Sequence, residues 1–329
     1  MKQLFQRSGF TLIELLVAVT VTLVLAGVML AVTAGTLDLW RRTQDSFTTS
    51  AQAKLVFDYL ERDLQSAVFR ADGQTWLAVD ISNAPGNLTN HGWLIEGALK
   101  PASLESQRYL PPVANGSAPG VEEARFGLSG VWLRLITTNM DNDGSVPVAV
   151  SYQIARRPVS GAINASSPAD VRYTLFRAAV AADGTFATGY DVTVAGYGSS
   201  AATPPAARSA GTLTNPNTAS DVIATNVVDF GVWFYGRAAS GSLTRIFPAV
   251  SSGNIVHRAD REEIFPAVAD VMVRILTEEG ARIIGGMERG SGTVIRPTSY
   301  VTDGEWWWAV VEANSRVVVR RIEIKGASS

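Results

Sequence analysis

The sequence predicts an α+β protein in which a long N-terminal helix, transmembrane first and amphipathic second, packs on an antiparallel β-sheet domain. Residues 10–37 are almost entirely apolar, and no proline or glycine occurs from Leu37 to Asp72. A single helix can therefore continue through both stretches. Beyond residue 70, short extended runs alternate with Gly, Pro and Asn, a pattern typical of strands and turns. We expect four segments in chain order: 1–9, 10–37, 38–70 and 71–329.

The composition fits a globular protein with one membrane-type helix. The chain has 329 residues, of which 47% are hydrophobic and 18% are charged. Its net charge of −2 argues against direct nucleic-acid binding, which needs clustered Lys and Arg. The sequence contains no cysteine, which excludes disulfides, a thiol nucleophile and cysteine-based metal sites.

The first helix is long enough to cross a lipid bilayer. Phe10 to Leu37 is a run of 28 residues in which Glu14 is the only charged one. As a helix this run is about 42 Å long, longer than the roughly 30 Å hydrocarbon core of a bilayer. A lone carboxylate in such a helix costs roughly 2.5–3.5 kcal/mol, so Glu14 is a candidate functional residue. Trp40, with two arginines after it, supplies an interface anchor at the far end.

A secretory signal peptide and a simple signal anchor are the two alternatives for this segment. A signal peptide has its small-residue cleavage site after the apolar run. Here the small residue Gly9 precedes the run, so cleavage there would keep the helix. Residues 31–35 could imitate a conventional signal-peptide cleavage site, but the apolar run before them is long for a signal peptide. A signal anchor needs no particular sequence at the boundary.

The boundary sequence Ser8-Gly9-Phe10-Thr11-Leu12-Ile13-Glu14 resembles the processing and assembly signal of type IV prepilins and pseudopilins. This resemblance implies that a prepilin peptidase cuts between Gly9 and Phe10, removes residues 1–9 and methylates the amino group of Phe10. It also implies that Glu14 pairs with the N-terminal amine of a neighbouring subunit during filament assembly. The implied partners are the peptidase, other minor and major subunits, an inner-membrane assembly platform and the bilayer.

The same resemblance implies a location. The protein would cross the bacterial inner membrane once, with its C-terminal domain in the periplasm, before it enters a pilus or pseudopilus. Major pilins carry a proline partway along the membrane helix, whereas the first proline of this chain is Pro85. The resemblance therefore favours a minor subunit.

The amphipathic part of the helix, residues 38–70, carries an apolar stripe. Val56, Leu60, Leu64 and Val68 recur at four-residue spacing, which places them on one helical face. This pattern predicts ordinary core packing against the following domain.

The body is expected to be one antiparallel sheet domain. In the last strand, Ile322 and Ile324 alternate with charged residues, as in a half-buried strand. Composition predicts mobile loops near 101–123 and 196–221. The candidate strands are Val131–Thr137, Val146–Ile154, Val171–Val180, Val227–Tyr235, Val268–Leu276, Trp306–Val311 and Val317–Ile324.

The body also resembles one branch of the family. Glu61-Arg62-Asp63-Leu64-Gln65, the run 171–177, Val228-Asp229-Phe230 and Phe265-Pro266-Ala267-Val268 are similar to J-type minor pseudopilins and W-type minor pilins. This implies a structural subunit at the tip of the type II secretion pseudopilus. The alternative is a minor pilin of a type IV pilus serving adhesion, motility or DNA uptake.

Catalytic and metal-binding patterns are weak. The run from Asn139 to Gly144 gives half of a calcium-loop pattern, but the twelfth position is Val150 rather than glutamate, and a solvated turn explains it equally well. His91 and His257 stand in no ligand or triad spacing. We therefore expect no enzyme activity, no metal site and no cofactor.

Two further patterns are interpreted as strands and turns. Gly285 and Gly286 follow the extended run Arg282-Ile283-Ile284, and a hairpin turn is the better interpretation than a phosphate loop. Acidic pairs such as Glu278-Glu279 would point to opposite faces of a strand, so they would not converge on one substrate.

The tryptophan run Trp306-Trp307-Trp308 is the unusual feature of the body. As a strand it would place Trp306 and Trp308 on one face and Trp307 on the other. Two-sided core packing is one interpretation. An aromatic contact surface for a neighbouring subunit is the other, because tryptophan is favoured at binding hot spots.

Overall fold

The computed structural model describes residues 11–70, 72–81, 131–139, 146–158, 171–198, 213, 219–247, 256–259, 265–288, 295–301 and 303–325. Contacts between residues divide the chain into two compact units, Met1–Thr48 and Thr49–Ser329. The boundary falls inside the first helix, so the last part of that helix belongs to the second unit. Gly9, Phe10, His91 and the predicted loop near 101–123 lie outside the described residues, as does most of Asn139–Gly144.

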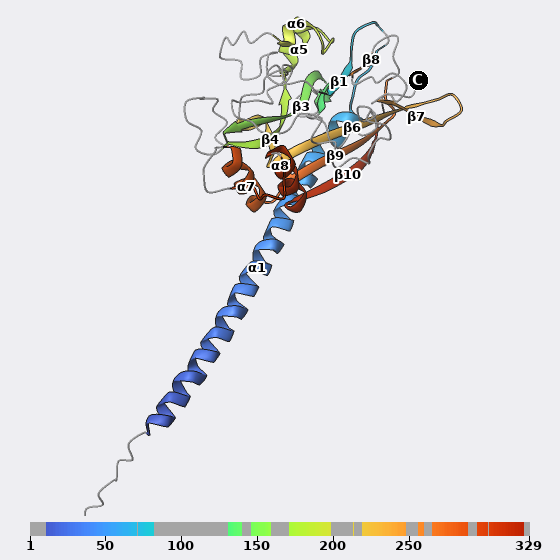
Figure 1. Ribbon diagram of the computed structural model, residues 1–329. Coiled ribbons are helices and arrows are strands. Elements are labelled where there is room, and N and C mark those ends of the chain that lie inside the picture. The colour runs from blue at the N-terminus through green and yellow to red at the C-terminus, as the bar shows by residue number, and fades with distance from the viewer. Residues whose placement is uncertain are drawn as a thin grey trace, which may run out of the picture. The chain divides into compact units, whose positions relative to one another are not determined.

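Helix α1 runs from Leu12 to Gln65 without a break (Figure 1). It ends earlier than the predicted residue 70 because the next residues pair with strand β2. Ala67 forms a β-bridge with Thr137, and the Val68 N–H donates to the Ile136 carbonyl. The apolar stripe is confirmed within the helix, where the side chains of Ala53, Val56, Phe57, Leu60 and Leu64 are at most 3% exposed. Val68, its predicted last member, lies beyond the helix end and is half-buried.

A six-stranded sheet forms one layer of the second unit, in the order β5-β4-β3-β2-β1-β8 with every neighbouring pair antiparallel. Its members are β1 (Leu77–Ile81), β2 (Val131–Asn139), β3 (Val146–Pro158), β4 (Val171–Ala179), β5 (Val222–Thr225) and β8 (Val256–Ala259).

The other strands form a second antiparallel sheet, so the predicted α+β fold with an antiparallel β-sheet domain is confirmed, with two sheets in place of one. Its order is β10-β9-β6-β7, with β6 (Val227–Arg237), β7 (Leu243–Phe247), β9 (Val268–Leu276) and β10 (Ser315–Glu323). The chain passes from the first sheet to the second at Asn226, whose φ is 60°. Asparagine tolerates this left-handed conformation better than most residues. The burial of Ile322 and Ile324 confirms the alternation predicted for β10.

Helix α7 (Glu278–Glu288) replaces the predicted hairpin at Gly285 and Gly286. The hydroxyl of Thr277 accepts a hydrogen bond from the Gly280 N–H, so Thr277 caps the helix start. A Cβ atom at Gly280 would lie 2.6 Å from the Cβ of Asn314, and only glycine allows this close approach.

Helix α8 (Asp303–Ala313) occupies the segment Trp306–Val311, for which a strand was predicted. The strand prediction is wrong because the buried positions do not alternate. Trp307, Trp308 and Val311 are all at most 2% exposed, and spacings of one and four residues place them on one helical face.

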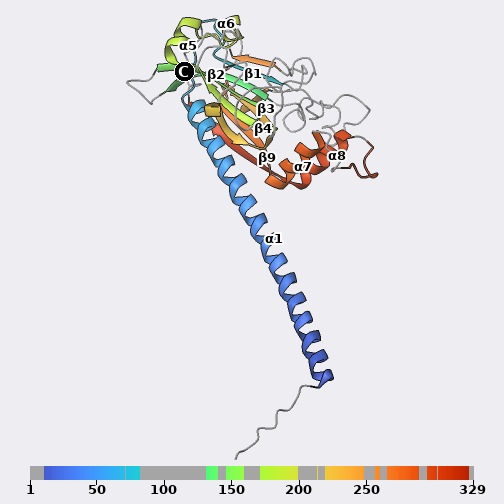
Figure 2. The same ribbon diagram turned by 90° about the vertical axis from the view of Figure 1, so that its left-hand side faces the viewer.

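Among the residues that the structure describes, the second unit also contains three short elements: α5 (Ala182–Thr188), α6 (Ala195–Gly198) and a 3-10 helix (Ala219–Asp221). The predicted loop at 196–221 therefore begins and ends in helical turns, and most of the rest lies outside the described residues. Within this unit, α5 and α6 lie at one end and α7 and α8 at the other (Figure 2).

Candidate functional site

The first turn of α1 is closed by reciprocal hydrogen bonds between Thr11 and Glu14. The Thr11 backbone N–H and hydroxyl both donate to the Glu14 carboxylate at 2.9 Å, and the Glu14 N–H donates to the Thr11 hydroxyl at 3.3 Å. This arrangement is a capping box, in which the residue before the helix and the third helical residue satisfy each other's N–H groups. The carboxylate also lies at the positive end of the helix dipole.

The polar side chains of the apolar segment are satisfied by the helix itself. The hydroxyls of Thr20, Thr22, Thr33 and Thr36 donate to backbone carbonyls three or four residues earlier. Each threonine thus leaves its methyl group as the apolar part of the side chain and has no unsatisfied donor, as a lipid environment requires. Glu14 is the exception, because its carboxylate keeps acceptor capacity beyond the two bonds from Thr11.

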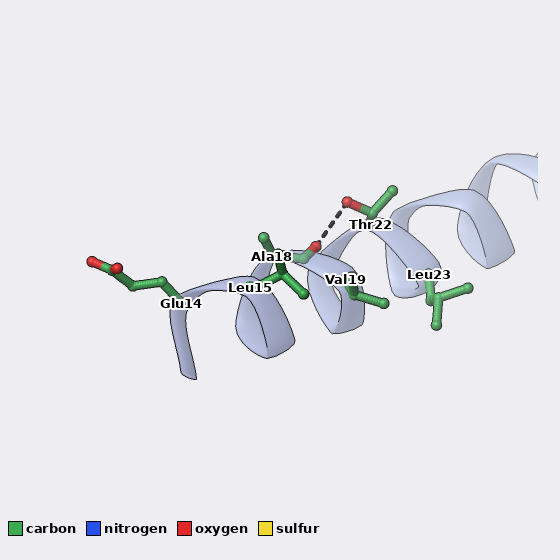
Figure 3. A pocket seen from close by; sticks show the side chains of 6 residues that line it. All are labelled: Glu14, Leu15, Ala18, Val19, Thr22 and Leu23. Carbon is green, nitrogen blue, oxygen red and sulfur yellow. Dashed lines mark hydrogen bonds between the residues drawn. The ribbon is translucent and has the colours of Figure 1, made fainter. Parts of the chain in front are cut away.

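The segment Leu12–Leu37 is long and apolar enough to cross a membrane, with a mean hydropathy of 2.8 and no residue buried within the protein. Figure 3 shows Glu14 at the start of a strip along one helical face. The strip lines a shallow hollow and consists of Glu14, Leu15, Ala18, Val19, Thr22 and Leu23. One helix cannot enclose a small ligand, so this strip suits lipid tails or the helix of a neighbour.

A second polar cluster lies where α1 meets the six-stranded sheet. Asp63, 2% exposed, accepts two hydrogen bonds from Arg177 of β4, at 2.6 Å from Nε and 2.9 Å from Nη2. The buried hydroxyl of Tyr152 on β3 donates to the same carboxylate. The Arg177 guanidinium also lies over the Tyr59 ring, 5.3 Å from its centroid. We call Asp63, Tyr152 and Arg177 the buried cluster.

The protonation states in the buried cluster support each other. Burial raises the pKa of Tyr152 well above its ordinary value, and the negative charge of Asp63 raises it further, so the hydroxyl stays a donor. Burial is the largest single influence on Arg177 and lowers its pKa, but the hydrogen bonds and charge interactions with Asp63 and Tyr152 together outweigh burial and leave the pKa raised. The cluster is thus a fully hydrogen-bonded ion pair rather than a proton-transfer site.

A cluster of the same three residue types lies on the four-stranded sheet. Arg321 of β10 donates to Asp270 of β9 at 2.7 and 2.8 Å, and the hydroxyl of Tyr235 on β6 donates to Asp270 at 3.1 Å. The hydrogen bonds with Asp270 raise the pKa of Arg321. Here the arginine side chain is 58% exposed and the aspartate 12%. We call these residues the exposed cluster.

The tryptophans of α8 mostly belong to the core. Trp307 packs edge-on against Trp308 and Tyr173, with ring centroids 5.0 and 5.9 Å away. The burial of Trp307 and Trp308 corrects the expectation of an aromatic contact surface and agrees with core packing. Trp306 is partly exposed.

Sequence reasoning missed Thr11, Tyr152 and Arg177 as site residues. The spacing Thr11-x-x-Glu14 is itself a capping-box signature and could have identified Thr11. No local pattern pairs Asp63 with Arg177, which are 114 positions apart. Within the described part of the chain, no group of three or more His, Asp and Glu residues could hold a metal ion.

Comparison with known families gives one match. Residues 4–30 match the prokaryotic N-terminal methylation motif. The match includes Gly9, Phe10, Thr11 and Glu14, and it supports a type IV prepilin-like protein with a single N-terminal helix consistent with an inner-membrane anchor. Comparison with curated proteins and with solved structures gives no match.

Proposed function

We propose that this chain is a structural subunit of a type IV pilin-like filament and that prepilin peptidase processes it. The observation that carries the proposal is the methylation motif at residues 4–30, joined to a membrane-length helix that has Glu14 in its first turn. Cleavage between Gly9 and Phe10 would keep the whole helix and place a new amine close to this carboxylate. Methylation would then modify the amino group of Phe10.

Glu14 is proposed to act as the assembly determinant. In the single subunit its carboxylate accepts hydrogen bonds only from Thr11 among the residues that the structure describes. A carboxylate in an apolar filament core needs a cationic partner, because an unpaired buried charge is strongly destabilising. The amine of Phe10 in a neighbouring subunit would supply that charge while Thr11 holds the carboxylate in place.

Within this superfamily we propose a minor pseudopilin at the tip of a type II secretion pseudopilus. The uninterrupted helix from Leu12 to Gln65 and the likeness of the body segments to J-type subunits support this choice. The protein would span the inner membrane once, with the second unit in the periplasm, and would contact other subunits and the assembly platform. A minor pilin of a type IV pilus is the second candidate, because the same segments resemble W-type minor pilins.

Intact-mass measurement of the protein purified from cells with active prepilin peptidase tests the processing. The expected product lacks residues 1–9 and carries one methyl group on Phe10. A Gly9→Val variant should stay uncut, because the bulky side chain blocks the peptidase site. A mature wild-type protein that retains Met1 would contradict the proposal.

Assembly is tested with Glu14→Gln, which is nearly isosteric and keeps an oxygen acceptor for Thr11. We expect normal cleavage and normal folding of the second unit, with at least a tenfold loss of subunit incorporated into sheared filaments. Thr22→Val is the matched control in the same strip and should assemble normally. Normal incorporation of the Glu14→Gln subunit would contradict the proposed pairing of Glu14 with the amine of a neighbouring subunit.

The choice of system is tested by site-specific photocrosslinking in living cells. Suitable positions are Leu55 and Phe186, whose side chains are 45% and 74% exposed. Capture of type II secretion minor subunits supports the first candidate, and capture of pilus subunits supports the second. Buried Trp307 is the negative control and should capture neither.

A further inference from the structure

We infer that β10 binds an extended segment of another filament subunit along its free edge, so that the four-stranded sheet continues into the neighbouring molecule. The inference rests on the proposed filament role, which supplies the source of the segment. β10 is an end strand of its sheet and pairs with β9 on one side (Figure 1). Within the described part of the chain, no strand pairs with its other side.

β10 is the longest of the four end strands in the two described sheets. β5 and β8 have four residues each and β7 has five, whereas β10 has nine. Short end strands limit unwanted pairing at sheet edges. β10 lacks this protection, and all of its residues pair with β9 in one continuous register. Its edge is therefore long enough for a partner strand of ordinary length.

The hydrogen bonds at the two ends of β10 show which backbone groups point away from β9. The Ile324 N–H donates to the Ala267 carbonyl, and the Thr277 N–H donates to the Asn314 carbonyl. Both pairs extend the register of β10 and β9, and in an antiparallel pair every second residue makes these bonds. Even-numbered residues of β10 therefore bond with β9. The odd-numbered residues present their N–H and carbonyl groups to the free edge: Val317, Val319, Arg321 and Glu323.

The arginines in the middle of β10 do not cover this edge. Charged residues protect many end strands by repelling a partner. Here Arg320 lies on one face of the strand and donates to Glu61 of α1 at 3.0 Å. Arg321 lies on the opposite face and is clamped by Asp270. A carboxylate of the same subunit neutralises each of these arginines, so little net charge opposes a partner strand.

Two exposed valines set the character of the partner segment. Val317 and Val319 are 40% and 51% exposed. They share one face of the strand, because alternate residues point to the same side. A β-branched or aromatic residue opposite each valine would remove it from water, and such cross-strand pairs stabilise sheets. The segment that fits is therefore extended and apolar on one face.

The position of β10 beside α1 indicates where this segment comes from. Arg316 donates to Ser50 at 2.7 Å and Arg320 to Glu61 at 3.0 Å, so β10 follows α1 in the same direction. Leu55 lies between these contacts along the helix and is 45% exposed. In the proposed filament, neighbouring subunits pack on α1. The neighbour that covers Leu55 is therefore within reach of the free edge.

A second copy of β10 fits this edge poorly. Antiparallel pairing of two copies would point their α1 helices in opposite directions, whereas the subunits of one filament share a direction. Parallel pairing about a two-fold axis would bring each arginine close to its counterpart, and like charges across strands are destabilising. The segment is therefore expected to belong to a different subunit.

Photocrosslinking of the full chain in living cells tests the inference. The photoreactive residue p-benzoylphenylalanine replaces Val317, and we expect it to capture a filament subunit other than this chain. Leu243, on the short end strand β7, is 40% exposed. It is the matched control position and should capture no subunit.

The outcomes separate the edge pairing from the filament role. Capture at Leu55 but not at Val317 would overturn the edge pairing and leave the proposed function standing. Capture at neither position would contradict both. Capture of only a second copy of this chain at Val317 would overturn the assignment of the partner to a different subunit.

A substitution at Val319 separates strand pairing from side-chain contact. Val319→Pro removes an N–H that faces away from β9, so the subunit should fold with an unchanged unfolding midpoint in urea. Capture at Val317 should fall about tenfold, because proline takes a donor from the pairing edge. Val319→Thr keeps the N–H and the β-branch and should leave capture unchanged. Unchanged capture in the proline variant would overturn the inference, as would its failure to fold, which would show that this N–H bonds with β9.

Discussion

The buried and exposed clusters contain the same three residue types joined in the same way, yet they differ in the exposure of their side chains to water. In each, an arginine clamps an aspartate through two hydrogen bonds and a tyrosine hydroxyl donates to the same carboxylate. The arginine is 16% exposed in the buried cluster and 58% in the exposed one. The same three residue types therefore contribute differently to stability in the two clusters, because an ion pair becomes indispensable only where neither partner can return to solvent.

The largest expected effect is that of Arg177→Met, which removes the bidentate partner of the buried Asp63 carboxylate. We expect the free energy of unfolding to fall by about 3–5 kcal/mol, because the buried carboxylate of Asp63 loses its bidentate partner and keeps only the half-exposed Arg62, 3.7 Å away, as a nearby cation. Urea unfolding of the full chain in micelles, followed by tryptophan fluorescence, measures this difference. A loss below about 1 kcal/mol would place the buried cluster in the same class as a surface ion pair.

The next effect is that of Tyr152→Phe, which removes one donor and keeps the ring. The expected loss is about 1.5–3 kcal/mol, the range for a hydrogen bond to a charged group. Tyr235→Phe is the matched control in the exposed cluster. It should lose less, since water can replace the hydroxyl beside Asp270. Equal losses in the two variants would contradict the proposed difference between the clusters.

The raised pKa of Tyr152 adds a dependence on alkaline pH. In the unfolded chain the hydroxyl ionises near pH 10, whereas the folded protein retains the proton. The stabilisation from Tyr152 is therefore complete below about pH 10 and decreases above it, by at most about 1.4 kcal/mol for each pH unit. Unfolding of wild type and Tyr152→Phe between about pH 8 and pH 11 should show the stability gap narrowing. A constant gap would mean that Tyr152 ionises equally easily in both states.

The two clusters also show where sequence reasoning succeeds and where it stops. The membrane helix and the strand Val268–Leu276 could be predicted because an apolar run and its length are local properties. Asp63 and Arg177 stand in two segments that resemble family sequences, but their contact depends on the tertiary fold. The run Trp306–Trp308 was misinterpreted because three consecutive aromatics fit a strand as well as a helix. Asp303 and Glu305 near its start favour a helix N-terminus, and this signal went unused.

The smallest expected effect is that of Arg321→Met in the exposed cluster. Asp270 keeps the Tyr235 hydroxyl and some contact with water, so the free energy of unfolding should fall by no more than about 1 kcal/mol. Raising the salt concentration to about 1 M shortens the screening length to about 3 Å and should remove most of this difference. The Arg177→Met difference should persist at the same salt concentration, because solvent ions do not reach Asp63. If salt abolished both differences alike, burial would not be what separates the two clusters.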